Sequence, residues 1–350
     1  MRQDPVLLSP LLLTLLLSVL GVLTPPDVSI GRLLPAAPAL AAALWRVVPT
    51  LVLGLACLLG VAVYAATSSE HSLMFTAGAI AAVTVAAAYA SHLRLKRECA
   101  LTEVSTVADA TQKVLLRPLP RYVGPLEIDS LYLTPTPRAR MGGDFYALAD
   151  TQHGIRLAIG DVRGKGLPAL VVAAAVLGSF REAAYEATDL TQLAKRLEVT
   201  LLRDDAATLA QGDPAELFAT AVLVEIPRHG SHATIFSCGH PPPLLSRRGS
   251  IDILDTEDPA PPLNIGGLLT TTCRPRRFDF RAGDQLLLYT DGVTETRDAT
   301  GEFFPLTIWA RDQLTTSPRQ ALNNLHHALL EHSGDNLNDD IAAIAIRKTT

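Results

Sequence analysis

The chain has 350 residues, of which 48% are hydrophobic and only 5% aromatic, and its formal charge is −5 at pH 7. This length allows one ordinary domain and a further segment, and a net negative charge without a Lys/Arg-dense stretch argues against nucleic acid as the main partner. The four cysteines lie far apart and form no CxxC pair, which argues against a structural zinc site or a disulfide framework.

The N-terminal part has the composition of a membrane region. Residues 1–92 carry almost no charge, and apolar runs over 6–23, 47–66 and 73–92 approach the ~20 residues that cross the hydrocarbon core. A shorter run, 33–45, contains Pro35 and Pro38, so it is either a kinked span or a re-entrant segment. We predict an all-α transmembrane region over 1–92 with four helices, three spans being the alternative.

The flanking charges predict the orientation. Arg94, Lys96 and Arg97 directly follow the last apolar run, and positive residues favour the cytoplasmic side. The sequence therefore predicts a multi-pass protein of the cell membrane with a cytoplasmic C-terminal domain. No Asp, Glu, Lys or Arg lies within the predicted spans, which favours an anchor or sensor over a transport path.

Residues 93–116 are predicted to form a helical signalling connector. This stretch lacks Pro and Gly, and Leu101, Val104 and Leu115 recur near helical spacing. It either pairs with a second copy in a homodimer or is a monomeric amphipathic connector. Pro118 and Pro120 then end the helix, because proline cannot continue one.

Residues 117–350 are predicted to form an α+β domain. Short apolar or β-branched runs bounded by Gly or Pro predict strands at 155–162, 217–226, 233–240, 284–292 and 339–348. Helical patterns follow Gly166, begin at an Asp189 cap, and run from a Ser317 cap to a Gly334 stop. Clustered strands with long intervening helices indicate stacked sheets covered by helices.

Acidic residues lie at the ends of the predicted strands. Asp161 and Asp291 each end an apolar strand, Asp339 and Asp340 begin a third, and Asp144 follows a glycine pair. Grouped carboxylates suit Mg²⁺ or Mn²⁺ rather than zinc, and their mutual repulsion calls for a cation. Each motif alone is more typical of a turn, so their combination and order carry the interpretation.

Six motifs together resemble a known family. They are GGDFY, IGDVRGKGLPA, FATAVL, CGHPPPLL, LLLYTDGVTET and NDDIAAIAIR. Over about residues 112–348 they resemble the SpoIIE/RsbU branch of the bacterial PPM-type (type 2C) serine/threonine phosphatases, and the membrane region before them resembles the actinobacterial type. The resemblance implies an αββα sandwich whose cleft holds two Mn²⁺ or Mg²⁺ ions and hydrolyses phosphoserine or phosphothreonine without a phosphoenzyme.

The resemblance also implies the site residues and the partner. Metal ligands and catalytic acids fall on Asp144, Asp161, Asp291 and Asp339, with the Val162 carbonyl as a further ligand and Asp340 as the alternative to its neighbour. The implied partner is a phosphorylated regulatory protein of the anti-sigma-factor antagonist type.

Several other polar residues are open to two interpretations. Arg138 and Arg140, and likewise Arg163 and Lys165, either contact the substrate phosphate or are ordinary surface residues. His240 is either a general acid or, as we favour, a residue that shapes the turn before Pro241.

Two alternative functions compete with the phosphatase. A diguanylate cyclase also carries a GG[DE]EF hairpin, but it requires a second acid where Phe145 stands. A catalytically inactive docking module of the same fold is harder to exclude, although the presence of all the expected acids favours an active enzyme.

Overall fold

The computed structural model describes residues 5–23, 33–67, 73–134, 142–209, 217–229, 231–265 and 273–350. The chain divides into two compact units, Met1–Val104 and Ser105–Thr350. Each unit is described by itself below.

All the elements described in the N-terminal unit are helices. Its elements are η1 (Pro5–Leu8), α1 (Ser9–Leu23), α2 (Ala36–Leu44), α3 (Val47–Thr67) and the first part of α4 (Leu73–Leu115). By length and composition, α3 and α4 contain windows apolar enough to cross a membrane, Val47–Tyr64 and Met74–Arg97, and α1 is a shorter apolar helix. The nine residues of α2 rise only about 14 Å. This length fits the re-entrant alternative better than a span, and the four-span count stays a prediction.

Polar contacts join the helices of this unit at one point. Arg94 of α4 donates to the carbonyls of Ala43 and Trp45 at the end of α2, and Ser91 donates to the Trp45 carbonyl at 2.8 Å. A guanidinium at a helix C-terminus satisfies carbonyls that lack helical partners and complements the helix dipole. The predicted span 73–92 and the predicted connector 93–116 form a single helix, α4, up to Leu115.

The C-terminal unit contains two antiparallel sheets. The six-stranded sheet has the order β1-β2-β11-β10-β7-β8, and the five-stranded sheet has the order β3-β4-β5-β6-β9. The strands of the first sheet are β1 (Tyr122–Val123), β2 (Leu126–Leu133), β7 (Leu244–Arg247), β8 (Ser250–Ile253), β10 (Gln285–Tyr289) and β11 (Ile341–Lys348). Those of the second are β3 (Phe145–Thr151), β4 (Gly154–Val162), β5 (Ala219–Ile226), β6 (His232–Cys238) and β9 (Arg276–Asp279).

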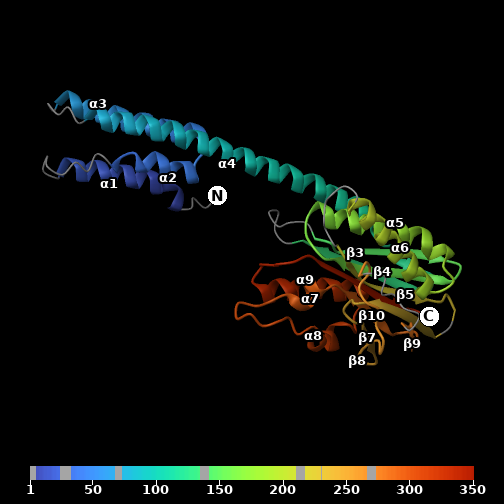
Figure 1. Cartoon of the computed structure of the whole chain (residues 1–350). Helices are drawn as coiled ribbons and strands as arrows, with labels where there is room; N and C mark the ends of the chain where they lie inside the picture. Colours follow the sequence, from blue (N-terminus) through green and yellow to red (C-terminus); the bar gives the residue numbers. More distant parts are fainter. Residues whose placement is uncertain are drawn as a thin grey trace. The chain divides into compact units, whose positions relative to one another are not determined.

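Helices cover the outer faces of both sheets. The helices are α5 (Leu167–Glu186), α6 (Leu190–Leu209), α7 (Asp291–Glu295), α8 (Leu306–Gln313) and α9 (Pro318–Ser333). Helices α5 and α6 pack on the five-stranded sheet, and α8 and α9 pack on the six-stranded sheet (Figure 1). The predicted αββα sandwich of the α+β class is confirmed.

The side-chain alternation of the central strands builds this layering. On β10, Leu286 and Leu288 enter the core between the sheets, whereas Leu287 and Tyr289 enter the core beneath α8 and α9. Successive side chains of a strand point to opposite faces, so a strand that is apolar at every position serves two cores at once. This double burial fixes the register of β10 and therefore the position of the residues that follow it.

Helix α5 is also long and apolar enough to be a candidate membrane span. Its apolar residues, however, pack in the core of the C-terminal unit. One face of α5, including Ala169, Ala173 and Val176, is buried in the core with the five-stranded sheet. Arg156 of β4, which is fully buried, donates to the carbonyls of Ala184 and Ala187 at the end of this helix. The apolar character of α5 therefore follows from burial against the sheet.

Candidate metal centre

Strand register brings the predicted acids to one edge of the sandwich. In the five-stranded sheet Phe145 pairs with Gly160, so Asp144 and Asp161, the next residues outward, lie beside each other. In the six-stranded sheet Tyr289 pairs with Ala343, which brings the end of β10, followed by Asp291, to the start of β11. Antiparallel pairing thus gathers residues that are far apart in the sequence.

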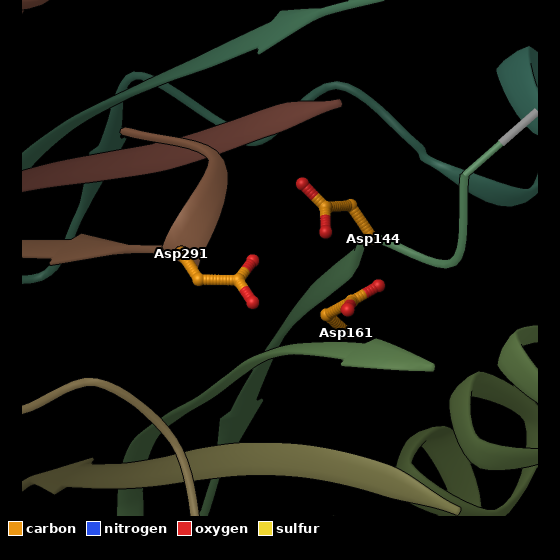
Figure 2. Close-up of side chains that lie close together, drawn as sticks. All are labelled: Asp144, Asp161 and Asp291. Carbon is orange, nitrogen blue, oxygen red and sulfur yellow. The ribbon is translucent and has the colours of Figure 1, made fainter. Parts of the chain in front are cut away.

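Three carboxylates converge between the two sheets. Asp144, Asp161 and Asp291 each contribute one oxygen to a group whose members all lie within 4.8 Å of one another. Figure 2 shows the three side chains pointing toward a common space from separate segments. The structure therefore brings together three of the five acids predicted from the sequence.

A pocket of about 340 Å³ opens over this cluster. Its lining includes all five predicted acids and two cations, and the described lining residues are Gly142, Gly143, Asp144, Asp161, Arg163, Gly164, Lys165, Phe218, Thr220, Asp291, Asp339 and Asp340. The pocket is thus predominantly anionic. A site of this kind attracts cations and repels an anionic substrate until its charge is neutralised.

The protein environment disfavours the ionised form of these carboxyls. Burial, followed by the charge of Asp161, raises the pKa of Asp144 well above its usual range. Burial and the charge of Asp291 raise the pKa of Asp161 to about 7, and burial also raises the pKa of Asp291. Carboxyls that repel one another in a partly dry site are stabilised in their ionised form by a bound cation. The donor set fits a hard divalent ion.

Thr290 holds the most buried of the three acids. Its hydroxyl donates to Asp144 Oδ2 at 2.7 Å and accepts from the backbone N–H of Ala342 at 2.9 Å. Thr290 is fully buried and directly follows β10 of the six-stranded sheet. Asp144 directly precedes β3 of the five-stranded sheet. This hydrogen bond therefore fixes a carboxylate of one sheet relative to the other.

The two acids of the last motif have different surroundings. Asp339 is exposed and pairs with Lys165 at 2.8 Å between Oδ1 and Nζ. Asp340 is buried, and its Oδ2 accepts from the Tyr132 hydroxyl at 3.2 Å. The Oδ1 atom of Asp340 is buried and has no hydrogen-bond partner among the described residues. Such an orphaned oxygen is an available ligand atom.

Two glycines make room for Asp340. A methyl group on Gly142 would lie 1.6 Å from Asp340 Oδ2, and one on Gly292 would lie 1.9 Å from the Asp340 carbonyl oxygen. No side chain fits at either position. The glycines of GGD and TDG therefore let the three motifs approach one another.

His240 is not among the described residues that line the pocket, but it contacts Thr220, which is. Its Nδ1 is 3.0 Å from Thr220 Oγ1 and its Nε2 is 3.1 Å from the Tyr289 carbonyl oxygen. Burial lowers the pKa of His240 to about 3, so the neutral ring donates from Nε2 and accepts at Nδ1. His240 thus links β5 to β10, a cross-sheet contact that the turn interpretation did not include.

The remaining predicted residues have varied positions. Val162 is fully buried at the end of β4, and its backbone N–H donates to the Gly143 carbonyl at 3.2 Å. Arg163 and Lys165 line the pocket. Arg138 and Arg140 lie outside the described residues. Phe145, which stands where a cyclase has its second acid, is fully buried in the core.

Sequence reasoning missed the residues that support the acids. Thr290, Tyr132 and Thr220 each hydrogen-bond to a predicted ligand, Thr220 through the Asp161 carbonyl at 3.4 Å. The position of Thr290 directly before Asp291 was a usable signal. Tyr132 had none, because it belongs to a strand that no motif marks.

The chain is similar to known proteins in both sequence and structure. The family described as Stage II sporulation protein E (SpoIIE) matches residues 151–349. The "Phosphoserine phosphatase RsbU" of Bacillus subtilis is 25% identical over 267 residues, which cover 75% of each chain.

Solved structures share the fold of this chain. The SiaA-PP2C domain of Pseudomonas aeruginosa has a TM-score of 0.55 at 17% identity, covering 73% of this chain and 98% of that one. The RsbU and RsbW domains of Rv1364c from Mycobacterium tuberculosis have a TM-score of 0.52 at 23% identity, covering 66% of this chain and 61% of that one. At these identities the likeness concerns the fold.

Proposed function

Because this chain belongs to the SpoIIE family and is a PPM-type protein phosphatase, we propose that it hydrolyses phosphoserine and phosphothreonine with the aid of bound Mn²⁺ or Mg²⁺. The observation that carries the proposal is the convergence of Asp144, Asp161 and Asp291 within 4.8 Å in one pocket. The cyclase alternative is set aside with the family assignment.

The carboxylates of the pocket suit divalent cations, and we propose that they hold two. Asp144, Asp161 and Asp291 would hold the metal pair, and the Val162 carbonyl remains a further proposed ligand. The orphaned Oδ1 atom supports Asp340 as an additional ligand, whereas Asp339 is engaged by Lys165 and would first have to leave that ion pair. Ions bound there would lower the pKa of a water molecule and neutralise charge on the phosphoryl group.

The lining of the pocket supports direct attack by water. Among its described residues there is no Cys or Ser, and its one hydroxyl, that of Thr220, is hydrogen-bonded to His240. Burial lowers the pKa of His240 to about 3, so this imidazole is too weak a base to activate the Thr220 hydroxyl as a nucleophile of the Ser–His kind. His240 is not among the described lining residues, and we assign it no role in proton transfer.

The family resemblance supports a regulatory protein as the substrate. We propose a phosphorylated protein of the anti-sigma-factor antagonist type. The hydropathy of α3 and α4 supports a multi-pass cell-membrane location. Arg94, Lys96 and Arg97 support a cytoplasmic catalytic domain. Pairing of two copies through residues 93–116 and the actinobacterial type stay predictions.

The test uses the full-length protein in detergent or nanodiscs. Release of phosphate from a phosphoserine peptide should require Mn²⁺ or Mg²⁺ and stop with EDTA, and Asp161→Asn should remove it without unfolding the domain. Absence of turnover with either ion would refute the enzyme and favour an inactive docking module. Phosphosites that accumulate in cells carrying Asp291→Asn would identify the substrate.

A further inference from the structure

The acidic pocket contains two cations from one loop. Arg163 and Lys165 both follow β4 and precede α5, and they are the cations among the described lining residues. The other charged lining residues are five aspartates. A phosphomonoester carries negative charge, so a cation at the pocket, beside the proposed metal ions, favours its approach to such a surface.

Lys165 already has a carboxylate partner for its ammonium group. Its ammonium lies 2.8 Å from Asp339 Oδ1, and both side chains are about half exposed. An anion that bound Lys165 would have to compete with this carboxylate.

Arg163 has a different environment. Its guanidinium carbon lies 5.1 Å from the centre of the Phe218 ring, and its backbone N–H donates to the Phe218 carbonyl at 2.8 Å. Among the described residues no carboxylate pairs with this guanidinium. Stacking on an aromatic face engages the plane of a guanidinium and leaves its N–H edges directed outward.

The position of Arg163 is fixed by the strands. Val162 pairs with Ala219 at the end of the β4–β5 ladder. Arg163 follows Val162 and Phe218 precedes Ala219, so these two residues lie side by side at the edge of the sheet. Arg163 is also two residues from Asp161 of the acidic cluster. The guanidinium is thus held beside the proposed metal site by both its backbone and its ring contact.

We propose that Arg163 binds the phosphoryl oxygens of the substrate phosphomonoester at the mouth of this pocket. The inference rests on the proposed phosphatase function and names one residue that recognises the substrate. A guanidinium with free N–H edges makes paired, charge-assisted hydrogen bonds to phosphate oxygens. Phe218 positions the guanidinium and does not itself contact the phosphate.

The experiment compares full-length wild type with Arg163→Ala and Arg163→Lys. The matched control is Arg297→Ala. The guanidinium carbon of Arg297 also lies over a phenylalanine, 4.0 Å from the centre of the Phe303 ring, but Arg297 is not among the described lining residues of the pocket. Substrates are p-nitrophenyl phosphate and a phosphoserine peptide, with inorganic phosphate as the inhibitor. For Arg163→Ala we expect KM for both substrates and Ki for phosphate to rise at least about ten-fold, because one lost hydrogen bond between charged groups already has that effect and the proposed contact is paired.

Other readouts separate this role from general damage. In Arg163→Ala the half-saturating Mn²⁺ concentration should not rise, because a cation has been removed from the pocket, and the unfolding midpoint should stay as in wild type. Arg163→Lys should lie between wild type and Arg163→Ala, and Arg297→Ala should match wild type. Unchanged KM and Ki in Arg163→Ala would overturn the proposal. A rise in KM for the peptide alone would also overturn it, because Arg163 would then contact the peptide and not the phosphoryl group.

A separate measurement keeps this inference apart from the proposed function. If wild type shows no metal-dependent turnover, the phosphatase proposal fails, but calorimetric titration of inorganic phosphate into the Mg²⁺-loaded protein still reports on Arg163. Weaker phosphate binding by Arg163→Ala than by Arg297→Ala would support the site. Equal binding by the two variants would overturn it.

Discussion

Replacement of Thr290 by Val tests whether one cross-sheet hydroxyl sets metal affinity. The change keeps the shape of the side chain but removes the donor to Asp144 Oδ2, 2.7 Å away, and the acceptor of the Ala342 N–H, 2.9 Å away. A hydrogen bond to a charged group contributes about 1.5–3 kcal/mol, and an unsatisfied buried donor costs about 1–3 kcal/mol. Because both losses are buried, we expect the free energy of unfolding to fall by roughly 2–4 kcal/mol.

Metal binding should weaken in the same variant. Burial and the charge of Asp161 raise the pKa of Asp144, and the Thr290 hydroxyl opposes that rise. Without the hydroxyl, the carboxylate is less favourably ionised and less well oriented. The half-saturating Mn²⁺ concentration should therefore increase about ten-fold or more, which corresponds to ~1.4 kcal/mol.

The control for this experiment is Thr290→Ser, which keeps the hydroxyl and loses only a methyl group. Urea unfolding in EDTA measures stability, and calorimetric Mn²⁺ titration measures affinity. Thr290→Ser should bind Mn²⁺ like wild type. If the Val and Ser variants have equal Mn²⁺ affinity, the hydroxyl does not hold the ligand and the reasoning is refuted.

Three further predictions concern charge, pH and metal removal. Lys165→Met should lower the half-saturating Mn²⁺ concentration about two- to five-fold, because the exposed ammonium neutralises Asp339 and repels incoming cations; unchanged saturation would show that the pair has no influence. Burial lowers the pKa of His240 to about 3, so below pH 6.5 the unfolded chain binds a proton that the folded domain does not. Relative to His240→Gln, wild type should therefore lose about 2 kcal/mol of stability between pH 7 and pH 5, and parallel stability curves would contradict this. Mn²⁺ at 100 times its Kd should raise the free energy of unfolding by about 2.7 kcal/mol, an increase that EDTA should abolish. Asp291→Asn should show little of this stabilisation, and a full effect in that variant would mean that Asp291 is not a ligand.

Much of the fold could be predicted because its strands are apolar runs. Strands β4, β5 and β11 were predicted within about two residues, since nearly every side chain in them is buried on one face or the other. Strand β2 was missed although it pairs with β11 along its whole length. Its Glu127 and Asp129 alternate with Leu126 and Ile128, so it lacks the uninterrupted apolar run that marked β4, β5 and β11.

The sequence was sufficient to predict which acidic residues form the candidate site, but not how their side chains are arranged. The resemblance named Asp144, Asp161 and Asp291, and the structure places them together. It could not show that Asp339 pairs with Lys165 while Asp340 turns into the protein toward Tyr132. That difference depends on the space above Gly142 and on a strand that carries no motif, which only the folded chain defines.

The proposed metal site is therefore a property of the interface between the two sheets. Asp144 and Asp161 belong to the five-stranded sheet, whereas Asp291 follows β10 of the six-stranded sheet. Carboxylates that repel one another would move apart if the sheets could slide, and two cross-sheet hydrogen bonds, from Thr290 to Asp144 and from His240 to the Tyr289 carbonyl, oppose that movement. The dense aliphatic core between the sheets resists the same displacement, because well-packed interiors have few alternative arrangements. Residues outside the proposed set of metal ligands thus fix the distances between the proposed ligands.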